Sequence, residues 1–351
     1  MSTDASPPST PVTPTTVWCR PDQTDLVREV AAALGLAVTH AGCPTRGRAT
    51  DVAGALDAQP LTDLRAAIAS AERGLVWMLD PGPFGSADDD AAAILAAHRR
   101  GVRLASLEPI PASALQLTEP WTQSHHGVRA VDVIHLGPLL SRMPTLGEAM
   151  EHREAMGRIR SVGIESCGRP EQGSLGAHLT GSLEFLIALF ETPELVDAAF
   201  VSARTENGLH EMAGETLRGL RGDMTLSMRF PSGQAATVLC SDHAGSWTRS
   251  ITLLGEGGRM HVTDLGFDWF APDGSVADHH RAEPRPEGPS GPRGGAVHAI
   301  VQDLASFLEP DQPGRVPIDP RPVLAAAQTA LLSCRTGQAE SPATITRLMM
   351  G

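Results

Sequence analysis

A carboxyl side chain stands where an apolar segment ends, at Glu108 in the stretch "ASLEPIPAS". Pro109 and Pro111 restrict the backbone that follows it. A carboxyl whose pKa is raised by its surroundings can act as a general acid or base, so Glu108 is a candidate catalytic residue. The alternative is a solvated or hydrogen-bonded residue at the rim of a turn that the prolines shape.

A second candidate site is the loop "CRPDQTD", which contains no glycine. Dinucleotide-binding folds usually have G-x-G-x-x-G after their first strand, because missing side chains let backbone amides approach the pyrophosphate. Arg20 is a candidate phosphate contact, whereas Asp22 and Asp25 would repel a phosphate. Amides of residues 20–24 facing an open cleft would leave room for a pyrophosphate, and a side chain of Arg20 or Gln23 in that space would exclude it.

Neither a metal site nor a disulfide framework is indicated. The five cysteines are scattered and contain no CxxC pair, which is typical of small buried side chains. Adjacent histidines occur at 125–126 and 279–280, and such pairs are usually solvent-exposed. We therefore expect no metal.

The candidate residues of the first half lie between alternating strand and helix patterns. Apolar residues recur at helical spacing in segments that end on glycine, and short β-rich runs separate them. The alternation predicts right-handed βαβ units, a parallel sheet with helices on both faces, and ligands at the carboxyl ends of the strands. The predicted strands are 15–19, 36–42, 75–79 and 102–107, and the predicted helices are 25–35, 61–74 and 86–101.

The second half changes to alternating strands joined by Gly-rich turns, which predicts an open antiparallel sheet of five or six strands. Helices are expected at 182–190 and 296–308, and 281–295 is a Pro/Gly loop. One face of such a sheet packs on helices, and the other, if apolar, needs a subunit partner. The strand segments are 157–166, 194–204, 223–230, 235–242, 249–264 and 267–280.

Composition limits the class of protein. A chain of 351 residues predicts two domains, at 16–135 and 136–351, after a disordered Ser/Thr/Pro tail at 1–15. A net charge of −13 without a Lys/Arg cluster argues against nucleic acid and membrane partners, which leaves a small molecule or another protein. The chain shows neither a leader pattern nor a membrane-spanning stretch, so we expect a cytoplasmic protein.

Four segments in order resemble the Gfo/Idh/MocA family, the relatives of glucose-fructose oxidoreductase and inositol dehydrogenase. They are "SRMPTLGEAMEHREAMGRIRSV", "MRFPSGQAATVLCSD", "ITLLGEGGRMHV" and "ALLSCRTGQ". The resemblance implies an α/β fold: a Rossmann-like domain for NAD or NADP, then an α+β domain with a large open, mainly antiparallel sheet. It also implies hydride transfer on a sugar, cyclitol or related polyol, homo-oligomers built through the sheet, and a last helix that packs back on the first domain.

The resemblance also assigns roles to residues. The family's catalytic lysine belongs to a Glu-Lys-Pro motif, and here Glu108 stands at the lysine position before Pro109. A His and Asp pair about one helical turn apart assists it; our alignment places Gly181 and Glu184 at these positions, with His178 as a substitute one turn earlier. The implied cofactor contacts are Arg20, Gln23, Thr24, His40, Asp80, Gly82 and Pro109, and the implied substrate contact is Arg142.

Three interpretations stay open, because the glycine fingerprint, the lysine and the histidine are altered together. The first is an NAD(P)-dependent oxidoreductase in which Glu108, His178 or Glu184 handles the proton. The second is a non-catalytic relative, a pseudoenzyme, that acts as a binding or regulatory subunit. The third is a reaction without redox chemistry, such as hydrolysis or epimerisation, that uses carboxylates in the same cleft.

Overall fold

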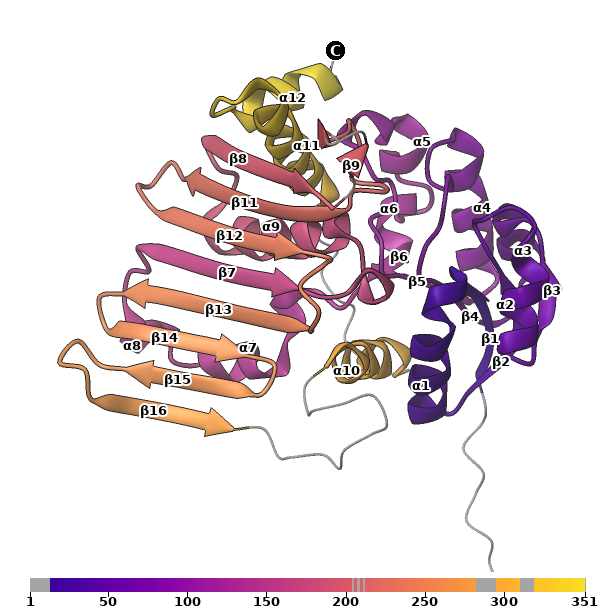
Figure 1. The fold of residues 1–351 in the computed structure, drawn as a ribbon, viewed down its shortest axis with the longest axis horizontal. Helices are drawn as coiled ribbons and strands as arrows, with labels where there is room; N and C mark the ends of the chain where they lie inside the picture. The colour runs from indigo at the N-terminus through magenta and orange to yellow at the C-terminus, as the bar shows by residue number, and fades with distance from the viewer. Residues whose placement is uncertain are drawn as a thin grey trace, which may run out of the picture.

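The chain folds around two separate β-sheets with helices between and around them (Figure 1). The structure is a computed structural model that describes residues 13–203, 205–206, 209–210, 212–281, 295–309 and 319–350. Residues 1–12 of the predicted tail lie outside these ranges, as does most of the predicted Pro/Gly loop. The last three residues of the predicted tail belong to the first strand, which begins at Thr13.

The first sheet is parallel, as predicted, with strand order β3-β2-β1-β4-β5-β6. Its strands are β1 (Thr13–Trp18), β2 (Leu36–Gly42), β3 (Gln59–Leu61), β4 (Gly74–Met78), β5 (Val102–Ser106) and β6 (Ile134–Leu136). The helices that connect them are α1 (Thr24–Leu34), α2 (Ala49–Ala55), α3 (Leu64–Ser70), α4 (Asp88–Arg99), α5 (Glu119–Thr122) and α6 (Ala130–Val133). β4 is a continuous apolar run buried on both faces, which is typical of a central parallel strand.

The second sheet has eight strands among the described residues, in the order β16-β15-β14-β13-β7-β12-β11-β8. All its neighbours are antiparallel except β7 and β12. The prediction of five or six strands was too low, because the turn at Asp273 and Gly274 folds one predicted segment into the hairpin β15–β16. The strands are β7 (Ser161–Cys167), β8 (Leu195–Ser202), β11 (Gly222–Arg229), β12 (Ala235–Ser241), β13 (Thr248–Gly255), β14 (Gly258–Thr263), β15 (Gly266–Phe270) and β16 (Val276–Arg281).

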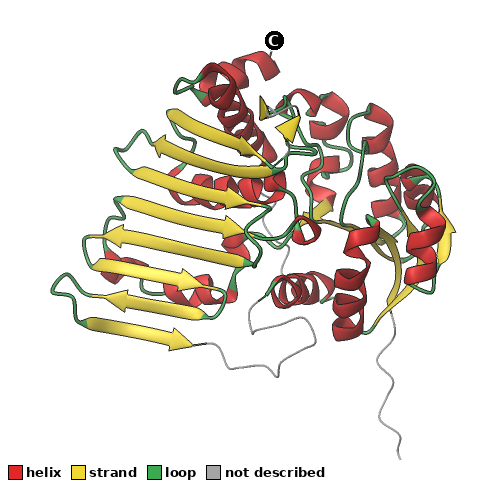
Figure 2. Cartoon of the chain, viewed as in Figure 1, coloured by secondary structure: helices red, strands yellow, loops and turns green. Residues whose placement is uncertain are grey.

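Helices cover one face of this sheet (Figure 2). Residues of β11 alternate strictly between buried and exposed, which is expected when one face lies on a core and the other faces solvent. The covering helices are α7 (Pro144–Met150), α8 (Arg153–Met156), α9 (Leu175–Phe190), α11 (Pro320–Thr336) and α12 (Pro342–Met350). A short hairpin, β9 (Thr205–Glu206) and β10 (Leu209–His210), lies apart from both sheets.

Two helices connect the halves of the molecule. α9 begins at Leu175, seven residues before the predicted start, and its first turn lies next to the end of β5. α10 (Ala296–Leu308) has the predicted bounds and packs on α1 and the first sheet (Figure 1). α11 packs mainly on β8 and α9 of the second half, and α12 packs on α11 and on a short turn of the first half, η2 (Ala114–Gln116). No helix of the described residues is long and apolar enough to cross a membrane.

Candidate functional site

Glu108 lies at the junction of the two halves, directly after β5. Its side chain is buried, and it accepts a hydrogen bond from the Ser174 backbone N–H at 2.9 Å and a second, short one from the Ser174 hydroxyl. Burial raises the pKa of Glu108 to about 7, although the hydrogen bonds from Ser174 oppose the rise. Near neutral pH the Glu108 carboxyl is therefore present in both its protonated and its ionised form.

Ser174, which the sequence did not single out, is the N-cap residue of α9. Its hydroxyl accepts a hydrogen bond from the Ala177 backbone N–H at 3.2 Å while donating to Glu108. The sequence does contain a signal for this N-cap, because a serine stands directly before a helical apolar pattern. Because the helix was expected to start at residue 182, Ser174 was not recognised as its N-cap.

His178 lies one turn into α9 and is also buried. Its Nδ1 lies 2.9 Å from the hydroxyl oxygen of Ser166, and its Nε2 has no partner among the described residues. The imidazole packs against Trp247 with a centroid separation of 5.5 Å. Burial, reinforced by the charge of Arg249, lowers the pKa of His178 to about 4, so the ring is neutral at pH 7.

The structure does not bring Glu184 to Glu108 and His178. Glu184 lies on another face of α9 and lines a different cavity, beside Arg142. The pair one helical turn apart at the start of this helix is Ser174 and His178, with Glu108 bonded to Ser174. Our alignment placed the family's carboxylate at Glu184, further along the same helix, and the catalytic roles of all these residues stay predictions.

The loop after β1 is closed by its own side chains. A short 3₁₀ turn, η1 (Pro21–Gln23), precedes α1. Gln23 is fully buried, and its Oε1 accepts a hydrogen bond from the Arg20 backbone N–H at 3.0 Å. The Gln23 N–H donates to the Arg20 carbonyl, and the Thr24 N–H donates to the Pro21 carbonyl. These three amides are therefore engaged within the turn.

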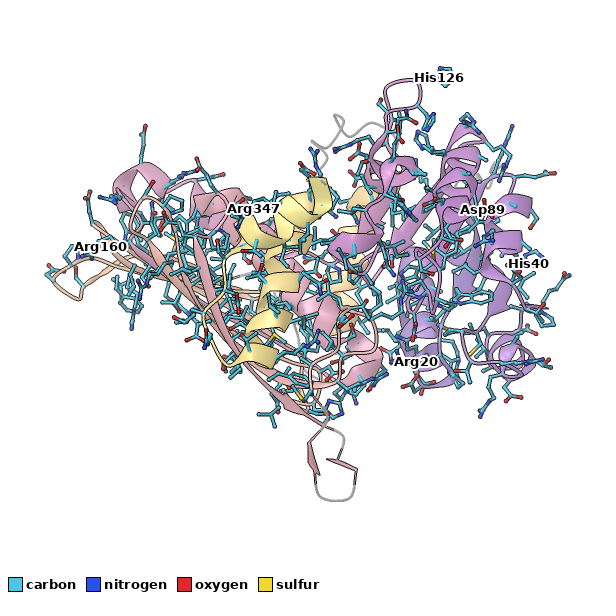
Figure 3. The ribbon with its side chains drawn as sticks, turned by 90° about the horizontal axis from the view of Figure 1, so that it is seen from above. Arg20, His40, Asp89, His126, Arg160 and Arg347 are labelled. Carbon is cyan, nitrogen blue, oxygen red and sulfur yellow. The ribbon has the colours of Figure 1, made fainter. Side chains whose placement is uncertain are left out.

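Arg20 joins this loop to the second half of the chain (Figure 3). Its guanidinium contacts Asp22 at 3.1 Å and Asp80 at 2.9 Å, and it donates to the Pro170 carbonyl at 2.8 Å. Gln23 adds a longer contact, from Nε2 to the Glu171 carbonyl at 3.4 Å. Loop η1 is thus bonded across the junction to a second 3₁₀ turn, η4 (Pro170–Gln172).

The other predicted cofactor contacts lie in different places: Asp80 and Pro109 lie near Glu108, and His40 does not. Asp80 follows β4, where its Oδ1 accepts from the Gly82 N–H at 2.9 Å and its Oδ2 faces Arg20. Pro109 lines a small cavity beside Glu108. His40 lies away from these residues, at the outer side of the first half (Figure 3), because β2 continues past it to Gly42.

A dinucleotide pyrophosphate does not fit the loop in this arrangement. Pyrophosphate needs free backbone amides at the start of α1 and a glycine-like approach. Here the amides of residues 20, 23 and 24 are paired internally, Gln23 fills the turn, and the carboxylates of Asp22 and Asp80 lie within hydrogen-bond distance of Arg20, the predicted phosphate contact.

The space around Glu108 and His178 is small. A cavity of about 40 Å³ beside Glu108 is lined by both acidic and basic groups, including Asp80, Arg218 and Arg221. A second, of about 30 Å³, lies beside His178 and Trp247. Each volume is close to the share of one water molecule, roughly 30 Å³.

Arg142 lies outside this region, on a short turn, η3 (Leu140–Arg142). Its Nη1 donates to the Leu136 carbonyl at 2.9 Å and lies 3.1 Å from Nδ1 of His135 and 3.5 Å from Oδ1 of Asp303. His135 Nε2 lies 2.5 Å from Oδ2 of Asp303 on α10. Sequence reasoning missed this pair, because its members are 168 residues apart and neither belongs to a motif.

Metal-ligand chemistry has no candidate cluster: no group of three His, Cys, Asp or Glu side chains in the described ranges could hold an ion. His280 contacts Glu148 at 3.0 Å on the surface, and both side chains are exposed.

No family model matches the chain, and no curated protein matches it by sequence. Solved structures match over nearly the whole length. The fold is that of the Gfo/Idh/MocA-type dehydrogenases.

Three of these matches illustrate the likeness. Biliverdin reductase from Synechocystis sp. PCC 6803, solved with biliverdin and NADP⁺, is 14% identical with a TM-score of 0.62, over 93% of this chain and 100% of that one. A myo-inositol dehydrogenase from Corynebacterium glutamicum ATCC 13032 is 14% identical with a TM-score of 0.61, over 94% and 99%. UDP-N-acetylglucosamine 3-dehydrogenase GnnA from Acidithiobacillus ferrooxidans is 15% identical with a TM-score of 0.60, over 93% and 99%.

Proposed function

We propose that this protein keeps a dehydrogenase fold without NAD(P)-dependent hydride transfer, and acts as a non-catalytic binding or regulatory subunit. The observation that carries the proposal is the position of Arg20. Its guanidinium connects the loop after β1 to Asp80 and to the Pro170 carbonyl of the second half. A cofactor that entered here would have to break these contacts and displace the buried Gln23 side chain.

The groups around Glu108 support the same conclusion. Glu108 replaces the proton-donating lysine that the family resemblance implies, and its carboxyl is bonded to the N-cap of α9 instead of facing open space. The cavities beside Glu108 and His178 have the volume of about one water each, so a sugar or cyclitol has no room beside these residues.

A second candidate function is an oxidoreductase of the same fold that binds NAD or NADP atypically and acts on a polyol. The pKa of Glu108, about 7, favours it, because a general acid or base works best when its pKa is near the operating pH. This second function requires that the turns η1 and η4 move apart, which breaks the contacts of Arg20 and Gln23 with η4.

Calorimetric titration of the purified protein with NADH and with NADPH separates the two functions. We expect no saturable heat with either cofactor at millimolar concentration, since the amides that bind pyrophosphate are engaged. Saturable binding, or polyol-dependent reduction of NAD⁺ or NADP⁺ that Glu108→Gln abolishes, would show the second function instead.

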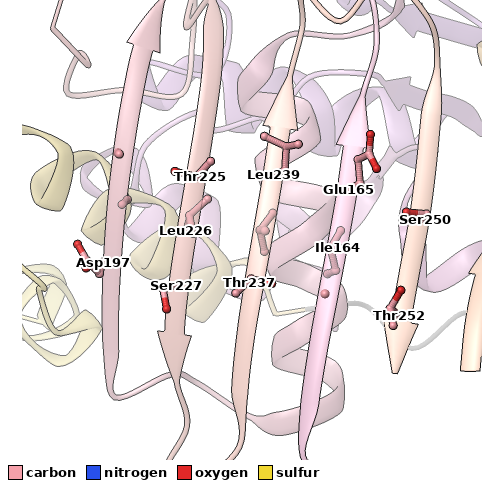
Figure 4. Close-up of a pocket in the computed structure, with 14 residues that line it drawn as sticks. Ile164, Glu165, Asp197, Thr225, Leu226, Ser227, Thr237, Leu239, Ser250 and Thr252 are labelled. Carbon is pink, nitrogen blue, oxygen red and sulfur yellow. The ribbon is translucent and has the colours of Figure 1, made fainter. Parts of the chain in front are cut away.

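We also propose that the protein is a homo-oligomer that associates through the open face of the second sheet. That face carries a broad depression of about 570 Å³ on five adjacent strands, lined by small polar and apolar side chains and by the carboxylates of Glu165 and Asp197 (Figure 4). Leu239 and Leu254, each 40% exposed, lie on it, and a second copy would cover them.

A further inference from the structure

A separate cavity of about 190 Å³ lies on the side of α9 away from His178. Its walls come from β6, α9, α10 and α11, and from the segment 109–111 after Glu108. The wall is mostly apolar, with Ile110, Ile134, Leu139, Phe307 and Val323 among its residues. A concave, largely apolar space with a few convergent polar groups is the usual form of a small-molecule site.

One polar group of the wall is a buried carboxyl without a complete set of partners. Glu184 is 4% exposed, and its Oε2 has no hydrogen-bond partner among the described residues. Thr180, one turn earlier on the same face of α9, lines the same cavity, but its hydroxyl already donates to the Gly176 carbonyl. The Glu184 carboxyl also has a hydrogen bond with the Ser141 side chain, so Oε2 is the atom left for a ligand to satisfy, and buried polar atoms are rarely left unpaired.

The second polar group is Arg142, which is anchored by one nitrogen only. All its hydrogen bonds to described residues use Nη1, so its Nε and Nη2 donate to none of them. The His135–Asp303 pair holds the guanidinium in place, and His135 itself stacks on Phe307 at 4.2 Å. The cavity thus has a fixed donor beside a fixed acceptor.

Charge and size select the ligand. The charged groups of the wall already have opposite charges beside them: Arg142 lies 3.5 Å from Asp303 and near Glu184, and both carboxylate oxygens of Asp132 accept from Arg129, so a neutral ligand needs no further counter-charge. An engineered apolar cavity of about 150 Å³ holds one benzene. A volume of 190 Å³ therefore suits a single ring with a polar head.

We infer that this cavity binds an uncharged monocyclic amide or lactam, whose carbonyl accepts from Arg142, whose N–H donates to Glu184, and whose ring lies against the apolar wall. The inference deepens the proposed binding role and rests on it. The lactam site is separate from the junction of Arg20 and Glu108, so the lactam site and the closed cofactor site have separate tests.

The test is titration calorimetry with ε-caprolactam as the probe, with cyclohexanecarboxylate and cyclohexylamine as charged comparisons. We expect saturable binding of caprolactam, binding of both charged rings weaker by at least about tenfold, and no competition from NADH. Glu184→Leu should weaken caprolactam at least about tenfold, whereas Thr329→Val, which removes a buried hydroxyl of α11 outside the cavity wall, should leave its affinity unchanged.

Several results would overturn the inference: no saturable binding of caprolactam, equal affinity in Glu184→Leu, or a charged ring that binds as tightly as the lactam. If Glu184→Leu does not fold, Val323→Phe fills the cavity and must abolish binding. Binding of NADH at the η1 turn would contradict the proposed function but would not change the caprolactam affinities expected here. Failure of the proposed function and failure of the lactam site are therefore distinguishable.

Discussion

The raised pKa of Glu108 gives the clearest prediction for a single residue. Its folded-state pKa of about 7 lies above its ordinary 4.5, so the folded protein holds this proton more tightly than the unfolded chain. The stability that Glu108 contributes is therefore full below pH 4.5 and is lost as the pH rises through 7, by about 3 kcal/mol in all.

Glu108→Gln should remove this pH dependence, because a neutral amide does not titrate and can still bond to Ser174, with its oxygen accepting from the backbone N–H and its nitrogen donating to the hydroxyl oxygen. We expect the variant to be more stable than the wild type above pH 7, measured by urea unfolding over a pH series. Glu72→Gln, a change at an exposed carboxylate in the loop after α3, is the matched control and should follow the wild-type curve. A Glu108→Gln curve parallel to the wild type would refute the assignment.

His178 should show the opposite pH dependence. Its folded-state pKa of about 4 lies below its ordinary 6.5, so its contribution to stability is present above pH 6.5 and is lost as the pH falls through 4. NMR titration of the His178 ring protons should give a midpoint near 4. A midpoint near the ordinary value would mean that the ring is not buried against Trp247.

At the scale of elements, the start of α9 depends on one hydroxyl. Ser174→Ala removes both an N-cap, worth about 1 kcal/mol, and a donor to a buried carboxyl, worth about 1–3 kcal/mol. We expect a loss of about 2–4 kcal/mol in the free energy of unfolding by urea. Asp63→Ala removes only an exposed N-cap, at the start of α3, and should cost about 1 kcal/mol. Equal losses in the two variants would contradict the link to Glu108.

The elements also show where sequence reasoning succeeds. α10 was predicted with its observed bounds, because apolar side chains recur at helical spacing over its whole length. α9 was predicted to start seven residues late, because Gly176, Thr180 and Gly181 have weak helix propensity. All three residues are buried in the folded chain, where Gly176 lies against Leu217 and Gly181 faces Leu139, and the local sequence does not reveal these contacts.

The candidate site was predictable to a similar degree. Glu108, Arg20 and Gln23 were singled out, since each follows a strand at the carboxyl edge of a parallel sheet. Pairing across the molecule was not predictable: Ser174 was not recognised as the partner of Glu108, and Glu184 was grouped with residues it does not meet. Long-range pairs such as His135 and Asp303 carry no local pattern.

For the whole molecule, the open sheet predicts self-association. Leu239→Arg places a charge at the centre of the exposed face and should convert the oligomer to a monomer, measured by light scattering after gel filtration. Leu265→Arg, at an exposed leucine in the turn between β14 and β15, is the matched control and should leave the mass unchanged. A wild-type monomer at all concentrations would refute the interface.

The central claim, that Arg20 and Gln23 close the cofactor site, is tested most directly by an experimental structure determined with saturating NADH. We predict the Arg20 guanidinium between Asp80 and the Pro170 carbonyl, Gln23 buried in its turn, and no dinucleotide at the start of α1. A pyrophosphate bound to the amides of residues 20–24, with Arg20 turned away, would contradict the account.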